Sequence, residues 1–173
     1  MITHEQLKSF LHYDPEMGIF VWMAPNSRRV HVGYEAGCLR KVDGYIQIMI
    51  NRRLYLAHRL AWLYVHGLWP KDQIDHINGV KDDNRIANLR EATRSQNMYN
   101  QGKRTDNSSG VKGISWHKPA KKWLVQIRFN GKNKYLGLFT DKHEAAESYR
   151  RAALLYHGEF ANTEGKESNR VSA

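Results

Sequence analysis

The sequence predicts an α+β protein made of two small domains. Short β-rich runs are mixed with amphipathic helical segments, and a polar stretch, GKRTDNSSG at 102–110, interrupts the pattern. After this stretch the pattern changes to three strands followed by one long helix. We therefore predict domains over 1–101 and 111–173, joined by a linker over 102–110.

The first elements are predicted from capping and turn residues. Thr3 and Gln6 form a capping-box pattern, which predicts a helix to about Phe10. A turn is predicted over 14–18, and β-rich runs predict strands over 18–22, 44–50 and 54–57. The segment 26–38 carries no clear pattern.

The next segments predict the order helix, strand, loop, strand, helix. Apolar residues at helical spacing predict a buried helix over 58–66, ended by Gly67. A strand begins at Ile74 and enters an Asn78-Gly79 turn, and a second extended segment covers 86–90. A second capping box, over 93–96, opens a helix that runs to about residue 101.

The second domain is predicted to be a three-stranded antiparallel sheet packed on one helix. Strands are expected over 111–116, 123–129 and 134–139, with a hairpin at Asn130-Gly131. Asp141 caps the helix, whose apolar face ends at Gly158. Alternation along the middle strand places Val125 and Ile127 on one face, and residues 126 and 128 on the other.

Charge is concentrated in the second half of the chain. The net charge is +10, of which +3 falls in residues 1–101 and +7 in residues 102–173. Between residues 103 and 134 there are nine basic residues and one acidic residue. Such a surface favours a polyanionic partner, because Lys and Arg neutralise phosphates and release counterions. Charge that only maintains solubility is the alternative, and composition alone does not separate the two.

Composition also limits the class of protein. One cysteine excludes an intrachain disulfide and a thiolate zinc site, and indicates a reducing compartment. The N-terminal segment lacks the features of a signal peptide, and no run of about 20 apolar residues occurs. We expect a cytoplasmic protein, in the host cytosol if phage-encoded, with no membrane partner and no small-molecule substrate.

One pattern of polar residues points to specific chemistry. Asp75 and His76 are adjacent, and Asn88 and Asn97 follow at 12 and 21 residues from the histidine. Over most of residues 10–101 the chain resembles the HNH endonuclease family, in the variant whose third signature position is Asn. The segments 57–60 and 13–18 look like those of phage-borne, homing-type members. The resemblance implies a ββα-metal fold and cleavage of DNA.

Hydrolysis of a phosphodiester needs a base for water and a cation for the developing charge. An imidazole that titrates near neutrality suits the base, and His76 is our candidate. A carboxylate and a carboxamide can hold one Mg²⁺ or Mn²⁺, which makes Asp75 and Asn97 the candidate ligands. The resemblance implies that Asn88 supports the loop and orients His76.

Each assignment has a structural alternative. Without its partners, the Asp75-His76 pair beside Asn-Gly is an ordinary polar turn. Asn84 is interpreted as a loop residue that bonds to the backbone rather than as a ligand. His58 is interpreted as a capping or core residue rather than a catalytic one. Arg59 is a candidate for phosphate contact, with an ordinary surface role as the alternative.

The second domain has a resemblance of its own. Over 108–162, the runs GISW (113–116), KYLGLF (134–139) and HGEF (157–160) resemble the DNA-binding domain of plant ethylene-response factors. That family places its sheet in the major groove and packs its helix behind. By position, the resemblance implies these candidate contacts to double-stranded DNA: Lys112, Trp116, Trp123, Gln126, Arg128 and Tyr135.

The chain departs from that family at informative positions. Lys112, Ser115 and Gln126 stand where those factors carry arginine. Lysine lacks the bidentate fork that reads guanine, so the target sequence cannot be transferred. One of the two tryptophans could instead be a core residue that anchors the sheet to the helix.

The sequence therefore predicts a phage-type homing or free-standing HNH endonuclease with a DNA-binding module. A catalytically inactive DNA-binding regulator is the first alternative. A non-specific nuclease, acting as a toxin or in scavenging, is the second. The pattern leaves open a monomer or a dimer assembled on DNA. A single active site per chain predicts nicking unless two chains meet.

Overall fold

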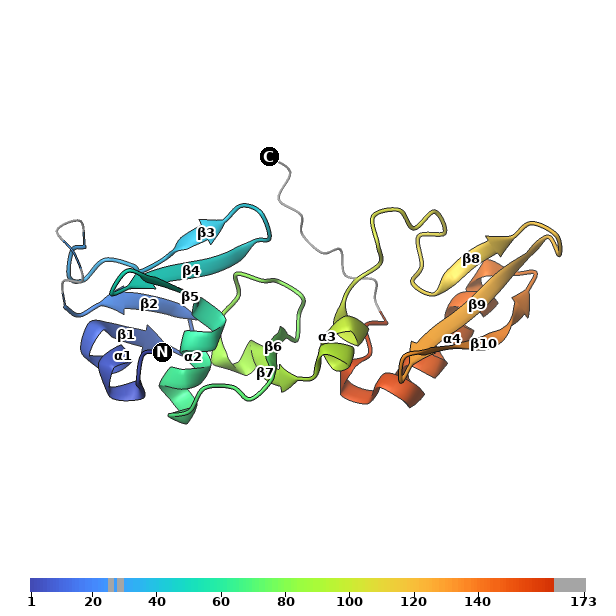
Figure 1. The fold of residues 1–173 in the computed structure, drawn as a ribbon. Coiled ribbons are helices and arrows are strands. Elements are labelled where there is room, and N and C mark those ends of the chain that lie inside the picture. The colour runs from blue at the N-terminus through green and yellow to red at the C-terminus, as the bar shows by residue number, and fades with distance from the viewer. Residues whose placement is uncertain (25–26, 28–29, 164–173) are drawn as a thin grey trace. The chain divides into compact units, whose positions relative to one another are not determined.

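The computed structural model describes residues 1–24, 27 and 30–163. Two compact units are present (Figure 1): the first covers Met1–Ala92, and the second begins at Thr93. Each unit has its own hydrophobic core.

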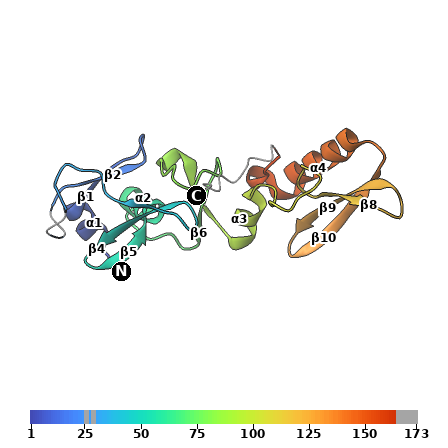
Figure 2. The same cartoon turned by 90° about the horizontal axis from the view of Figure 1, so that it is seen from above.

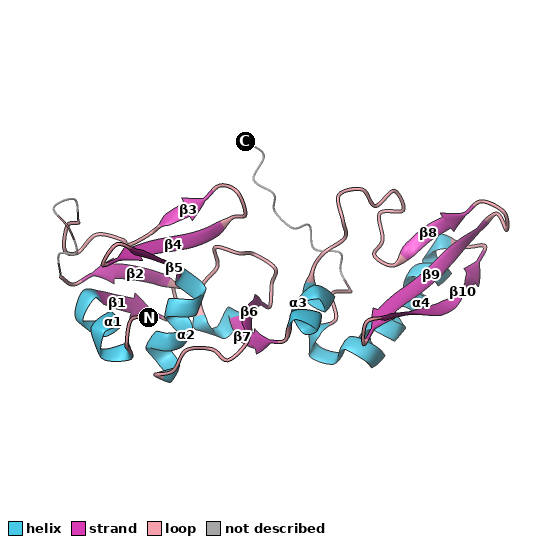
Figure 3. Cartoon of the chain, in the orientation of Figure 1, coloured by secondary structure: helices cyan, strands magenta, loops and turns pink. Residues whose placement is uncertain are grey.

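The first unit contains two helices and three small antiparallel sheets (Figure 3). Strands β1 and β2 form one sheet, β3, β4 and β5 a second, and β6 and β7 a third. In chain order its elements are α1 (His4–Phe10), β1 (Leu11–Asp14), β2 (Ile19–Trp22), β3 (Cys38–Arg40), β4 (Tyr45–Ile50), β5 (Arg53–Leu56), α2 (Ala57–His66), β6 (Gln73–His76), a 3₁₀ turn (Ile86–Asn88) and β7 (Leu89–Ala92).

Most of these elements were predicted from local sequence signals and are present in the structure. Both bonds of the capping box at Thr3 and Gln6 are present, and Gly67 ends α2 in the left-handed conformation with φ of 75°. Strands β1 and β3 were not predicted. Each is short and lies beside a partner, so its pairing rather than its own pattern defines it.

The core of the first unit connects its sheets to the loop that precedes β7. Leu7 and Leu60 are fully buried, and the ring of Tyr13 packs 4.7 Å from that of Phe20. The hydroxyl of Tyr13 donates a 2.6 Å hydrogen bond to the carbonyl of Asn84. The loop around Asn84 is therefore fixed to the core.

The second unit is a sheet covered on one face by a helix. Strands β8 (Ile114–His117), β9 (Lys122–Phe129) and β10 (Lys132–Phe139) pair antiparallel in the order β10-β9-β8. Helix α4 (Lys142–His157) covers this sheet (Figure 2) and leads into a 3₁₀ turn (Gly158–Phe160). The predicted hairpin is present, with positive φ at Asn130 and Gly131, and Oδ1 of Asp141 caps α4.

Small and aromatic side chains build the core between sheet and helix. Val125 and Ile127 of β9 are buried against Ala145 and Ala153 of α4. Gly113 has φ of 73°, and a Cβ there would lie 2.1 Å from the ring of Tyr149. Only glycine therefore allows this close approach.

Helix α3 (Arg94–Asn100) belongs to the second unit. The amine of Lys112 donates to the carbonyls of Tyr99 and Gln101, at 2.8 and 2.6 Å. The ring of Tyr99 stacks on that of His157 at 3.8 Å, and Asn162 donates to the carbonyl of Asn100. The compact unit thus starts at Thr93, before the linker that the sequence predicts over 102–110, because these contacts attach α3 to the C-terminal segment.

Among the described residues, no helix is long and apolar enough to cross a membrane.

Two glycines of the second unit give a controlled test of its packing. Replacing Gly131 by Ala adds only the strain of a left-handed residue, about 1–2 kcal/mol, because no atom lies near its Cβ position. Gly113→Ala should cost at least about 1–3 kcal/mol more, because the methyl group meets Tyr149. Urea unfolding of the full chain measures both, and equal losses would contradict the close packing.

Candidate functional site

The pairing of β6 with β7 sets the geometry of the site. Asp75 lies opposite Arg90, and His76 lies opposite Leu89. Both Asp75 and His76 are buried, each about 4% exposed. The hairpin therefore places an acid and an imidazole next to each other at the end of β6.

Asp75 forms a buried ion pair with its cross-strand neighbour. Its Oδ2 accepts from Nε of Arg90 at 2.9 Å and from Nη2 at 2.8 Å. The side chains are only 5% and 13% exposed. A buried charge requires such a partner, and the guanidinium holds the carboxylate in one orientation.

The ring of His76 contacts Asn84. Nε2 of His76 lies 3.3 Å from Oδ1 of Asn84, which is only 2% exposed. Burial lowers the pKa of His76 below its ordinary value, although the contact with Asn84 and the charge of Asp75 oppose this change. The neutral imidazole, which can accept a proton, is therefore favoured.

Asn88 holds the loop backbone rather than the histidine ring. Its Oδ1 accepts from the backbone N–H of Asn78 at 2.9 Å, and its Nδ2 donates to the carbonyl of Asp83 at 2.8 Å. Asn88 therefore bonds to the backbone of the loop between β6 and β7 at two points. The orienting contact to His76, which was expected from Asn88, is made by Asn84.

Two more rings surround His76. The centroid of His58 lies 5.1 Å from that of His76, nearly edge-on, and Tyr45 lies 5.0 Å from His58. Burial lowers the pKa of His58 to about 3, so this ring is neutral. Its Nδ1 is buried without a hydrogen-bond partner among the described residues. His58 thus packs against the site as a buried residue of α2.

The ligand set that could hold a metal ion is small. Among the described residues, no group of three or more His, Cys, Asp or Glu is arranged to bind a metal. Asp75 supplies a hard anionic oxygen, which fits Mg²⁺ or Mn²⁺. Asn97, the second expected ligand, lies on α3 in the second unit.

Arg59 makes structural contacts in the first unit. Its guanidinium donates to the carbonyl of Asp72 at 3.1 Å and to that of Pro70 at 3.4 Å, and lies 5.9 Å from the ring of Trp69. These contacts connect α2 to the segment that leads into β6.

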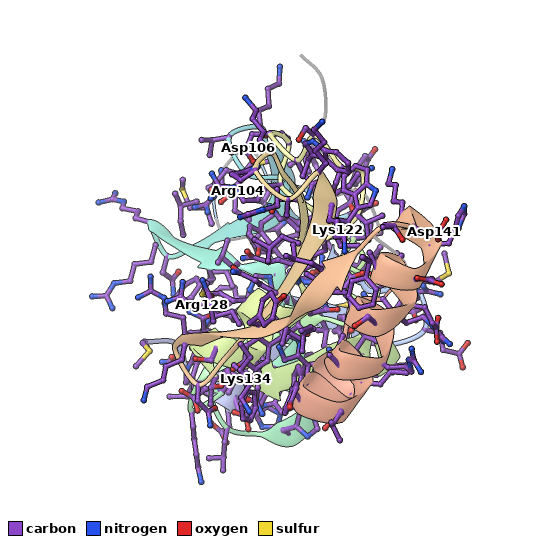
Figure 4. The ribbon with its side chains drawn as sticks, turned by 90° about the vertical axis from the view of Figure 1, so that its right-hand side faces the viewer. Arg104, Asp106, Lys122, Arg128, Lys134 and Asp141 are labelled. Atoms are coloured by element: carbon purple, nitrogen blue, oxygen red, sulfur yellow. The ribbon has the colours of Figure 1, made fainter. Side chains whose placement is uncertain are left out.

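The sheet of the second unit has one face free of α4. Register places Gln126 beside Tyr135, and Arg128 beside Asn133, on this face. Figure 4 labels Arg128 on β9. Gln126, Arg128 and Tyr135 are exposed on this face.

Part of the free face is the floor of a groove. Helix α3 and the segment 101–107 wall a hollow of about 650 Å³. Among the described residues that line this hollow, lysine and arginine side chains outnumber the acidic ones, which are represented by Asp106. Its lining includes Tyr99, Arg104, Ser115, Gln126, Arg128 and Asn133.

Three other expected DNA contacts lie elsewhere. Trp116 and Trp123 pair with each other in the register of Val125, so they occupy the side covered by α4. Trp123 packs on the core, and Trp116 is 48% exposed beside it. Lys112 is directed at the carbonyls of α3, and burial lowers its pKa to about 8.

Comparison with known proteins finds one domain match and two viral relatives. The model of a family described as HNH endonuclease matches residues 55–99, which include Asp75, His76 and Asn88. Protein 3.8 of Escherichia phage T7 is 33% identical over 105 residues, or 60% of this chain and 86% of that protein. The chain therefore contains an HNH endonuclease domain, matched over residues 55–99.

A second relative is also viral. An uncharacterized HNH endonuclease of Acanthamoeba polyphaga mimivirus is 32% identical over 106 residues. The match covers 60% of this chain and 54% of the mimivirus protein. No solved structure matches the chain.

Two residues of the HNH hairpin escaped sequence reasoning. Arg90 holds Asp75, and Asn84 contacts His76. Arg90 could have been found, since opposite charges often pair directly across strands. The contact of Asn84 has no such signal, because it depends on how the loop folds back.

Asn84 should be needed for the nuclease activity that the HNH match implies. Asn84→Ala removes the contact to the His76 ring, and we expect a cleavage rate about 10–100-fold lower. Asp82→Ala is the control, since Asn84 bonds only to its backbone carbonyl. Single-turnover cleavage of plasmid DNA measures both, and equal rates for the two variants would remove Asn84 from the site.

Proposed function

We propose that this chain is a metal-dependent endonuclease that hydrolyses phosphodiester bonds of double-stranded DNA. The observation that carries the proposal is the buried, oriented pair of Asp75 and His76 at the end of β6, within a sequence of the HNH family. By its viral relatives, a phage-type homing or free-standing endonuclease is the form that we propose.

His76 is the proposed general base. A carboxamide oxygen can only accept, so the contact with Oδ1 of Asn84 assigns the ring proton to Nε2. Nδ1 then takes the proton from water as its oxygen attacks phosphorus and the bond to the 3′-oxygen breaks. Burial supports this role, because it keeps the imidazole neutral before the reaction.

Asp75 and Asn97 are the proposed ligands of one Mg²⁺ or Mn²⁺. Asp75 fits as an anionic oxygen donor that Arg90 holds in place, and Asn97 is assigned by the spacing of the motif. The bound cation would supply positive charge at the scissile phosphate and the leaving oxygen. Asn88 keeps the loop folded around this pair.

The second unit is proposed to bind the DNA and provide site preference. Arg128 has no acidic partner among the described residues, so its charge is available to a phosphate. Gln126 and Tyr135 flank it on the same face. Binding by this unit would raise the local concentration of DNA at a small catalytic site.

Cleavage of a supercoiled plasmid tests the nuclease. With Mg²⁺ the intact chain should cut and with EDTA it should not, and His76→Ala should lower the rate about 100- to 10,000-fold without loss of DNA binding. His12→Ala, an exposed histidine of β1, is the control and should cut normally.

The products separate the alternatives. Nicked circles indicate one cut strand, and discrete fragments from genomic DNA indicate site preference. Uniform degradation would favour the non-specific nuclease. If the chain binds DNA but does not cleave it with any divalent metal, the nuclease proposal fails and the DNA-binding regulator is favoured.

The DNA interface is tested with a matched pair of arginines. Arg128→Gln should weaken duplex binding, and the slope of log affinity against log salt should fall by about one, because one phosphate contact is lost. Arg151→Gln changes the same charge on the exposed side of α4 and should leave both unchanged. Binding by the His76→Ala chain in EDTA measures this, and equal effects would contradict the proposed face.

A further inference from the structure

The end of α3 is bonded by side chains that follow it in the sequence. A helix leaves its last carbonyls without partners inside the helix. Here the carbonyls of Tyr99 and Gln101 accept from Lys112, at 2.8 and 2.6 Å, and the carbonyl of Asn100 accepts from Asn162 at 2.7 Å. Three consecutive carbonyls are thus bonded by residues of the C-terminal segment.

The side chain of Tyr99 adds a second attachment. Its ring is parallel to that of His157, with centroids 3.8 Å apart and an interplanar angle of 5°. Nε2 of His157 donates to the carbonyl of Arg128 at 2.8 Å, which fixes the ring on the sheet. The hydroxyl of Tyr99 accepts from the backbone N–H of Asn130 at 3.2 Å.

Helix α3 has few other means of stability. Its seven residues are fewer than the roughly 12–15 that an isolated helix needs in water. Asn100 is its only buried residue, so it contributes no buried apolar side chain to a core. The capping box at Thr93 and Gln96 secures its start, and the contacts above secure its end.

We propose that Tyr99, Lys112, His157 and Asn162 form a clamp that positions Asn97 for metal binding. Asn97 lies on α3, and its carbonyl accepts from Gln101, whose own carbonyl the clamp holds. The inference rests on the proposed role of Asn97 as a ligand. It makes the C-terminal unit part of the cleavage machinery as well as a DNA-binding module.

The clamp is tested in the full-length chain with Tyr99→Ala. Hydrogen exchange of the α3 amides, without metal or DNA, should become faster because the helix opens more often. At saturating DNA, the single-turnover rate at limiting Mg²⁺ should fall about 10–100-fold, and more Mg²⁺ should be needed for half-maximal rate. Because the rate is read at saturating DNA, a change of DNA affinity at the groove that Tyr99 lines does not enter this comparison.

Matched variants separate the clamp from a general loss of folding. Tyr99→Phe keeps the stacked ring and should restore protection and Mg²⁺ dependence. Met98→Ala, on the exposed side of the same helix, should behave as wild type. Asn162→Ala removes one carbonyl partner and should shift exchange and Mg²⁺ requirement in the same direction, which keeps the test valid if Tyr99→Ala does not fold.

Two results would overturn the clamp. In the first, α3 exchanges at the wild-type rate in Tyr99→Ala and Asn162→Ala. In the second, exchange rises while the cleavage rate and the Mg²⁺ requirement stay unchanged. Absence of cleavage by the intact chain is a different failure, that of the proposed nuclease, and hydrogen exchange still decides whether these residues hold α3.

Discussion

The candidate site depends on the antiparallel pairing of β6 with β7. A slip of one residue would turn each of Asp75 and His76 to the other face of the hairpin and leave Asp75 without Arg90. Because that pair is buried, separating its charges carries a large penalty, and this penalty fixes the register. The loop between the strands is then held twice, by Asn88 from within and by Tyr13 from the core.

Much of the candidate site could be predicted from the sequence because its residues lie close together along the chain. The spacing of Asp75, His76 and Asn88 indicated the family, and the hairpin signal at Asn78-Gly79 indicated where the strand ends. The contact of Asn84 with His76 was not predictable, because a single sequence shows which residues are near along the chain but not which side chain turns inward. Strands β1 and β3 escaped for a related reason, since their partners define them.

In the second unit, the alternation of side chains along a strand predicted some of the faces but not all of them. It correctly separated Val125 and Ile127 from Gln126 and Arg128 within one strand. The faces of Trp116 and Lys112 required information from outside their own strand: the register against β9 and the position of α3. The polar composition of 102–110 predicted a linker between two domains. The hydrogen bonds from Lys112 and Asn162 to the carbonyls of α3 were not predictable, because bonds to backbone carbonyls leave no apolar pattern in the sequence.

Residues that follow α3 in the sequence bond to its C-terminal carbonyls, and this limits where the two units can be joined in a chimera. A recombination junction placed in 102–110 would give a new partner domain to α3 and discard the donors of Lys112 and Asn162. The buried carbonyl of Asn100 would then lack its hydrogen bond, and the C-terminal end of α3 would have unpaired backbone carbonyls. A chimera that preserves both folds is instead joined before Thr93, so α3 stays with the second unit although the HNH match extends into it.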